Sequence, residues 1–333
     1  MRGKADPRVM RIIRFSILIA AALITRQDLS WAQEYPQRPV RFIVPYPPGG
    51  GADTLVRIIT RGLSARWKEP IVVDNRPGGD ATIGVQLAAT APPDGHTLVL
   101  IITSHAVHPS LKKLPYDLIR DFAPVSNILE GPAILLTNPA LKAANVQELI
   151  AMAKARDGQL TFAGSGVGGP GHLSGIMFNY LAGVKTTHIP YKGGLQAITA
   201  LIGGEVDFMF ATVLSGMPHV KSGRMRALAV TSAQRSSFAP ELPTVIESGL
   251  GTFESTTWYG VLTRGGTPVP IVEKIHADML AVVQTPEVAQ TLTAQGVQIV
   301  GMPPRQFAAH LQSEIRKWAV IVKQANMQDM QNN

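Results

Sequence analysis

The chain has 333 residues, room for about two domains at roughly 100 to 200 residues each. Hydrophobic residues make up 45% and charged residues 16%, which excludes a disordered chain, and the lack of cysteine excludes disulfides, thiolate metal sites and thiol nucleophiles. The formal net charge is +8, but half of it belongs to residues 1–32. The sequence has no basic stripe with interleaved aromatic residues, so nucleic-acid binding is not predicted.

Residues 1–32 have the pattern of a secretory signal peptide. Basic residues precede an apolar run from Phe15 to Thr25, and small residues follow up to Ala32. This run is shorter than the roughly 20 residues that a spanning helix needs. The sequence therefore predicts cleavage after Ala32 and an exported protein, with an uncleaved anchor as the alternative.

From residue 40 onward, short β-branched runs alternate with segments of helical periodicity, which predicts an α/β fold. Strands are expected at 40–44, 71–73 and 98–102. The helices between them carry Leu55, Ile58, Ile59 and Leu63 in the first case, and Ile83 and Leu87 in the second. This order predicts a first series of parallel strands joined by crossover helices.

A second series begins at 133–136 and continues with a helix that Asn145 opens, with Glu148 three residues later as in a capping box. Further strands are expected at 160–163, 187–189, 206–210 and 227–230. After an irregular stretch at 240–270, two amphipathic helices follow that have no strands of their own. We expect their apolar faces to pack on the first series.

These elements predict two lobes, each a mostly parallel sheet flanked by helices, with a ligand cleft between them. Domain 1 is predicted to be discontinuous and to comprise residues 33–132 and 236–333. Domain 2 is predicted to comprise residues 133–235.

Two glycine-rich loops each join a strand directly to a helix. One runs from Pro45 to Asp53, and the other from Gly164 to His172 in the second series. Glycines let the backbone approach a ligand closely, and a helix N-terminus offers unpaired N–H groups to an anion. We therefore predict that each lobe holds one end of an acidic molecule, with simple tight turns as the alternative. Asp53 is expected to be a helix N-cap rather than a catalytic acid.

The predicted ligand-binding residues come from these loops and from neighbouring strand ends. They are Tyr46, Pro47, Pro48, Gly49, Gly50, Gly51, Ala52, Asp53, Thr54, Ser104, Ser165, Gly166, Val167, Gly168, Gly169, His172, Tyr191, Asp207, Ala211 and Thr212.

The second loop also matches a dinucleotide fingerprint in form. Gly164, Gly166 and Gly169 have the spacing G-x-G-x-x-G after a strand and before a helix. No Asp or Glu stands between Asp157 and Glu205 to hold a ribose, so no cofactor is predicted.

Two further chemistries rest on residue type alone. Ser165, His172 and Asp207 are the types of a hydrolase triad, but the G-x-S-x-G elbow is absent. His105 and His108 have metal-ligand spacing on an expected solvated loop without a nearby carboxylate, so no metal site is predicted.

Ordered blocks along almost all of the mature chain resemble one family. They are Tyr35-Pro36, Pro45-Tyr46-Pro47-Pro48-Gly49-Gly50 with Asp53, Asn75-Arg76-Pro77-Gly78, Pro93-Asp94-Gly95-His96-Thr97, Leu114-Pro115-Tyr116-Asp117, Asp121-Phe122-Ala123-Pro124-Val125, Pro190-Tyr191-Lys192-Gly193-Gly194, Arg226-Ala227-Leu228-Ala229-Val230-Thr231 and Trp258-Tyr259-Gly260. In this order they resemble the Bug-type extracytoplasmic solute receptors, the substrate-binding proteins of tripartite tricarboxylate transporters.

The resemblance implies a periplasmic, non-enzymatic receptor with the periplasmic binding protein fold. A monomer is expected, because the cleft must open and close. The receptor would capture a dicarboxylate, tricarboxylate, amino acid or aromatic acid and deliver it to the membrane subunits of a transporter. The resemblance also implies that loops 46–54 and 165–172 hold ligand carboxylates through main-chain groups and waters.

Ile176 stands where the family often has an acidic residue, and this favours an apolar or aromatic acid. The alternatives are an exported hydrolase that uses Ser165 and His172, and a ligand-sensing partner of a signalling system.

Overall fold

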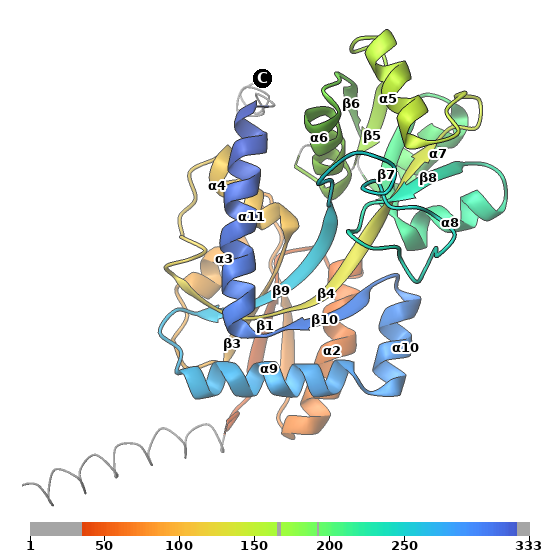
Figure 1. Ribbon diagram of the computed structural model, residues 1–333. Helices are drawn as coiled ribbons and strands as arrows, with labels where there is room; N and C mark the ends of the chain where they lie inside the picture. The colour runs from red at the N-terminus through yellow and green to blue at the C-terminus, as the bar shows by residue number, and fades with distance from the viewer. Residues whose placement is uncertain (1–34, 165–167, 192, 325–333) are drawn as a thin grey trace, which may run out of the picture.

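The structure, a computed structural model, describes residues 35–164, 168–191 and 193–324. The predicted signal peptide therefore lies outside the described residues. Figure 1 shows two lobes with long strands passing between them. The first lobe contains β1 (Val40–Val44), β2 (Ile71–Asn75), β3 (Thr97–Ile102) and β10 (Gln298–Met302), and the second contains β5 (Thr161–Gly164), β6 (Thr187–Pro190), β7 (Phe208–Thr212) and β8 (Arg226–Val230).

Two long strands, β4 (Phe122–Thr137) and β9 (Thr256–Arg264), connect the lobes. The strand order is β2-β1-β3-β9-β4-β7-β5-β6, with β8 and β10 also paired to β4. β1 is parallel to β2 and β3, and β5 is parallel to β6 and β7, whereas β4 and β9 run antiparallel to their neighbours. The two-lobed α/β prediction is confirmed, but β9 lies within the stretch that was expected to be irregular.

The lobes meet where β4 changes partners. Its first part pairs with β9 and β10, and its last part, from Ala133, pairs with β7 and β8. The chain returns on β9, whose Thr256 pairs with Pro132. Phe253, which precedes β9, stacks on Phe210 of the second lobe, with ring centroids 5.9 Å apart. We therefore propose a second boundary near Ser255 rather than the predicted residue 235.

Helices cover both faces of each lobe. In the first lobe they are α2 (Gly51–Trp67), α3 (Thr82–Ala89), α4 (Thr103–Leu111), α9 (Val269–Val283), α10 (Pro286–Ala294) and α11 (Pro304–Gln324), and in the second α5 (Val146–Ala155), α6 (Pro170–Ala182), α7 (Gly194–Gly203) and α8 (Val213–Lys221). The amphipathic helices α9 and α11 pack against the first lobe, α9 on α2 and α11 on α4, as expected. The Asn145 cap is also confirmed, because its side chain accepts from the Glu148 N–H at 2.9 Å.

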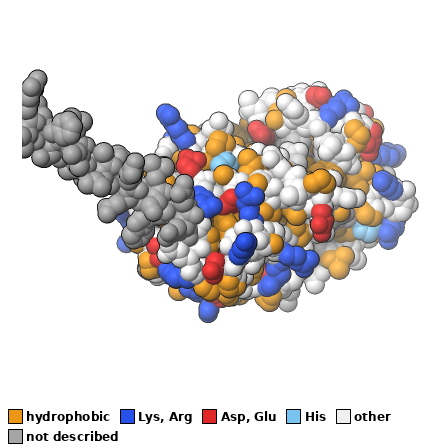
Figure 2. All heavy atoms as spheres, turned by 90° about the horizontal axis from the view of Figure 1, so that it is seen from below, with side chains coloured by type: hydrophobic (Ala, Val, Ile, Leu, Met, Phe, Trp, Pro, Cys, Tyr) orange, Lys and Arg blue, Asp and Glu red, His pale blue; other side chains and the backbone are white. Residues whose placement is uncertain are grey.

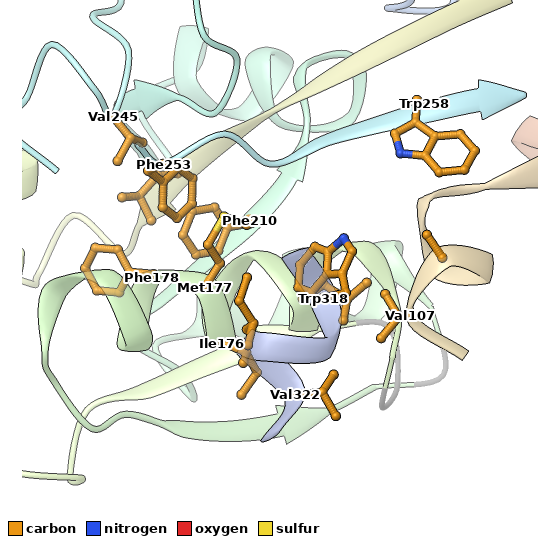
Figure 3. Packing of buried hydrophobic residues seen from close by; sticks show 14 of the residues in the cluster. Val107, Ile176, Met177, Phe178, Phe210, Val245, Phe253, Trp258, Trp318 and Val322 are labelled. Carbon is orange, nitrogen blue, oxygen red and sulfur yellow. The ribbon is translucent and has the colours of Figure 1, made fainter. Parts of the chain in front are cut away.

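One hydrophobic cluster passes from lobe to lobe on the α11 side. It includes Val107 and Trp318 of the first lobe together with Ile176 and Phe210 of the second. Figure 3 shows Trp318 of α11 and Ile176 of α6 within this packing. Ile176 is 7% exposed and belongs to the core, so the argument that this residue makes the ligand site apolar is wrong.

The remaining faces carry their own clusters. In the first lobe Phe42 and Leu63 pack with Ile275 and Met279 of α9, and in the second α7 and α8 cover the sheet face opposite α6. The underside of the molecule mixes basic and acidic side chains (Figure 2). Among the described residues, no helix has both the length and the apolar character needed to cross a bilayer.

Candidate ligand-binding site

A cavity of about 540 Å³ lies between the lobes, beside the crossing of β4 and β9. This volume is within the usual range for small-molecule sites. The crossing strands contribute Gly131, Pro132 and Thr256 to its wall, and the first lobe contributes Tyr46 and Tyr259. The second lobe supplies most of the rest, from Gly164, α6, α7, β7 and α8.

Five helices of the described chain begin at this cavity. Residues of the first turn, or the N-cap, of α2, α4, α6, α7 and α8 line it: Ala52, Thr103, Pro170, Gly171, Gly194, Leu195, Thr212 and Ser215. The first turn of a helix carries N–H groups without helical partners and a partial positive charge. The cavity is therefore suited to an anion.

The side chains of the wall add little charge of their own. Among the described lining residues there is no Asp, Glu, Lys or Arg, and His219 is the one histidine. Lys192 lies outside the described residues.

Several hydroxyls of the wall are also already paired within the protein. Ser174 Oγ lies 2.8 Å from Ser255 Oγ, and Thr212 Oγ1 lies 2.8 Å from Ser215 Oγ. Thr103 Oγ1 donates to the Thr256 carbonyl at 3.0 Å. Main-chain N–H groups and the hydroxyls of Tyr46 and Tyr259 thus remain as donors for a ligand.

Asp53, in the first turn of α2, fixes the first glycine-rich loop by accepting a hydrogen bond from its main chain. The N-cap of α2 is Gly50, so the prediction of Asp53 as N-cap is wrong. It stands three residues later and reaches back, its Oδ2 accepting from the Gly49 N–H at 2.8 Å and from Arg57 Nε at 2.9 Å. Burial alone would raise the pKa of Asp53, but hydrogen bonds from Arg57, Gly49 and Asn75 outweigh it and lower the pKa.

His172 fixes the second glycine-rich loop in the same way, by accepting a main-chain hydrogen bond. It also stands three residues after its N-cap, Gly169, and its Nδ1 accepts from the Gly168 N–H at 3.0 Å. Gly49 and Gly168 have left-handed φ values of 79° and 78°, which favour glycine. The two loops therefore use one construction, with a carboxylate in one lobe and an imidazole in the other.

His172 is buried behind the loop rather than in the cavity wall. It is 1% exposed, and its ring lies 4.2 Å from that of His188, between centroids. Burial, with a smaller effect from His188, lowers the pKa of His172 to about 3. A neutral imidazole that already accepts a main-chain hydrogen bond at Nδ1 is poorly placed to act as a general base.

Asp207 lies outside the cleft, contrary to the prediction. Its carboxylate accepts from the N–H and hydroxyl of Thr161, at 2.8 and 3.1 Å. It directly precedes β7, whereas the residues of β7 that line the cavity run from Met209 to Thr212, and Asp207 itself is not in the cavity wall. The expected strand 206–210 in fact occupies 208–212, which places Asp207 before its start. Asp207 and His172 therefore do not assemble a triad, and Ser165 lies outside the described residues.

The other predicted site residues fall into four groups. Tyr46, Ala52, Ala211 and Thr212 line the main cavity, and Pro47, Ser104, Gly168 and Gly169 line a side cavity of about 330 Å³. Tyr46 lines both the main cavity and the side cavity and lies between them. Pro48, Gly49, Gly50, Gly51, Thr54 and Tyr191 are in neither wall, and Ser165, Gly166 and Val167 lie outside the described residues.

His105 and His108 are in α4 and buried, so the expectation of a solvated loop is wrong. Pro109 suggested a loop, but the helix accommodates it. His105 Nδ1 accepts from the Ile102 N–H at 3.0 Å, and burial lowers the pKa values of His105 and His108 to about 3 and about 4. Among the described residues, no group of His, Cys, Asp and Glu could hold a metal ion.

The predicted ligand-binding residues include Thr212, the N-cap of α8, but omit other wall residues of α7, α8 and β9. Leu195, Ser215, His219 and Tyr259 all line the cavity. The signal for α7 was present in Gly193-Gly194, which form the N-cap and first residue of this helix. Trp258, the neighbour of Tyr259, is 1% exposed and donates from Nε1 to Glu314 at 3.2 Å, so it packs in the core and not in the cavity wall.

Comparisons with known proteins agree with this geometry. Residues 55–327 match the family model described as tripartite tricarboxylate transporter family receptor. The chain is 35% identical to BugT of Bordetella pertussis, over 88% of this chain and 91% of that protein.

Two solved structures share its fold. The structure of R. palustris Rpa4515 with adipate has a TM-score of 0.75 at 31% identity, covering 88% of this chain and 98% of that one. MatC from Rhodopseudomonas palustris with bound malate has a TM-score of 0.73 at 30% identity, covering 86% of this chain and 100% of that one. The chain therefore belongs to the family of tripartite tricarboxylate transporter receptors, which have the periplasmic binding protein fold.

Proposed function

We propose that this protein is an exported, non-enzymatic receptor that captures a small carboxylate between its lobes and delivers it to membrane subunits of a tripartite tricarboxylate transporter. One observation carries the proposal: helix N-termini from both lobes meet at a cavity with no Asp, Glu, Lys or Arg among its described lining residues. Such a site attracts an anion through oriented main-chain dipoles.

The arrangement also supports closure on the ligand. The lobes are joined by β4 and β9, and an acid that contacts α2 and α6 together gains contacts when the lobes approach. Only contacts that are better in the closed form can drive closure. The closed form would then be the state that docks on the transporter.

The ligand class follows from the wall and from the relatives. Adipate and malate in the two related structures are both dicarboxylates. An amino acid would bring an ammonium group, for which the described wall offers no carboxylate. We therefore favour an acid without an amino group.

The first test is a thermal-shift screen of the mature protein from Gln33, unfolded and refolded to remove any carried-over ligand. Mono-, di- and tricarboxylates are compared with neutral partners of the same skeleton, such as adipate with adipamide. An acid at 100 times its dissociation constant should stabilise the fold by about 2.7 kcal/mol, a rise of a few degrees in Tm. Stabilisation by the neutral partners alone would refute the anion site.

A further inference from the structure

The cavity wall in the second lobe extends along two neighbouring helices. Leu195 and Ile198 lie about one turn apart on α7, and Ser215 and His219 lie one turn apart on α8. All four line the cavity, as does Met209 of β7, and α7 contacts α8. We call these five residues the α7–α8 arm.

The arm is mainly apolar. Leu195 is 76% exposed although it is a large aliphatic side chain, and Ile198 and Met209 continue the same surface. Ser215 adds no free donor, because its hydroxyl donates to the Thr212 carbonyl at 3.1 Å and also lies near Thr212 Oγ1. Covering such a surface with an apolar ligand body is favourable.

His219 is the exception in this surface. Its side chain is partly buried, and its Nδ1 is buried with no hydrogen-bond partner in the described chain. Most buried polar atoms in folded proteins are hydrogen-bonded. An imidazole can donate from one nitrogen and accept at the other, so it can bind a hydroxyl, a carbonyl or a carboxylate.

We propose that the α7–α8 arm binds the far end of the ligand and that His219 hydrogen-bonds a polar group there. This rests on the proposed receptor function, in which the first carboxylate is held at the helix N-termini. The ligand class is then an acid with an apolar middle and a second hydroxyl, carbonyl or carboxylate at the opposite end. Ligand selection would lie in α8 as much as in the glycine-rich loops.

The test is a double-mutant cycle between His219 and the end of the ligand. Hexanoate, 6-hydroxyhexanoate and adipate share one carbon chain and differ at its far end. Their affinities are measured by calorimetry on refolded wild-type protein and on His219→Phe, which keeps a ring and removes both nitrogens. His276→Phe is the matched control, because His276 also has a buried, unpartnered Nδ1 but lies in α9, outside the cavity wall.

In the wild type we expect either 6-hydroxyhexanoate or adipate to bind at least about fivefold more tightly than hexanoate. This ratio corresponds to the gain of one hydrogen bond. In His219→Phe this ratio should fall below about twofold while hexanoate binding stays the same, and His276→Phe should keep the wild-type ratio. His219→Gln, which retains a donor and an acceptor, should give an intermediate ratio and provides the readout if the Phe variant does not fold.

The experiment distinguishes a failure of the His219 proposal from a failure of the receptor proposal. If the ratio is unchanged in both His219 variants, the role of His219 is wrong and the receptor function stands. If no acid of the screen binds the wild type, the receptor proposal itself fails.

Discussion

Asp53 and His172 occupy the same position in their helices and accept the same kind of main-chain hydrogen bond, from a left-handed glycine four residues earlier. Their bonds fix the loops and leave the N–H groups of the following turn free for a ligand. Binding at this site therefore depends on residues that do not line the cavity.

Removal of the Asp53 carboxylate should loosen the first loop. We expect Asp53→Ala to lower the free energy of unfolding by about 1 to 3 kcal/mol, because the part-buried hydrogen bonds from Gly49 and Asn75 to the charged carboxylate are lost. Asp53→Asn keeps one acceptor oxygen and should lose less. Urea unfolding and acid-binding calorimetry measure both effects, and an Ala variant equal to wild type in both would contradict the assignment.

Three buried histidines and the half-buried His188 predict a pH dependence of stability. The pKa values of His105 and His172 fall to about 3, and those of His108 and His188 to about 4, mainly because burial disfavours the charged ring. The unfolded chain therefore binds protons that the folded chain does not. Stability is full above pH 6.5 and falls as the pH drops toward the folded-state values.

A fully buried imidazole such as that of His105 contributes up to about 1.4 kcal/mol per pH unit in this range. We expect Tm to decrease clearly between pH 7 and pH 5, and His105→Phe to reduce the slope. A Tm independent of pH between these values would contradict the lowered pKa values of these histidines.

Substitutions at Gly194 test whether main-chain N–H groups bind the ligand. It is the first residue of α7 and lines the cavity, and a side chain at this position would extend into open space. Proline is tolerated at this helical position but has no N–H. Gly194→Pro should weaken acid binding by about tenfold, since hydrogen bonds to charged groups contribute about 1.5 to 3 kcal/mol, whereas Gly194→Ala should stay near wild type. Equal loss in both variants would point to steric hindrance instead.

At the level of elements, the local sequence pattern located the short parallel strands and most helices, but it did not reveal how the lobes connect. β4 contains Pro124, Gly131 and Pro132, residues that usually interrupt strands, and β9 follows a stretch rich in glycine. Pairing between the two strands stabilises both, and that pairing joins residues more than 100 positions apart. Such long-range pairing has no local signal.

The contact between β9 and α11 predicts a sensitive position. A Cβ at Gly260 would lie 2.2 Å from Phe307 Cζ, inside a buried cluster. We expect Gly260→Ala to cost about 1 to 3 kcal/mol, as overpacked cores do. Gly203→Ala is the control, because the nearest atom there is 3.9 Å away and alanine favours a helix. Urea midpoints that do not separate the two variants would contradict the close packing.

At the scale of the whole molecule, the cluster shared by α11 and α6 predicts that both lobes unfold together. The three described tryptophans, Trp67, Trp258 and Trp318, all lie in the first lobe or on its returning strand, so fluorescence reports that lobe. Far-UV circular dichroism reports both lobes. The two signals should give one coincident urea transition, and two separate midpoints would show that the lobes unfold independently.

The sequence located the site at the level of two loops and a family, because glycine-rich turns before helices have a strong local pattern. It did not identify the wall residues that lie beyond the starts of α7 and α8. Leu195 and His219 look like ordinary helix residues in the sequence, and only the packing of α7 against α8 brings them to one cavity.

The paired crossing strands have an evolutionary consequence. The chain enters the second lobe after Pro132 and leaves it before Thr256, and these two residues face each other across one ladder, about 5 Å apart. The segment between them, which forms the second lobe, therefore has its two junctions with the first lobe side by side in the fold. Replacement of the coding segment at both junctions would exchange α6, α7 and α8 together, and with them the second-lobe part of the cavity wall. We expect such a replacement by the segment of a relative to change ligand preference while the first lobe stays intact.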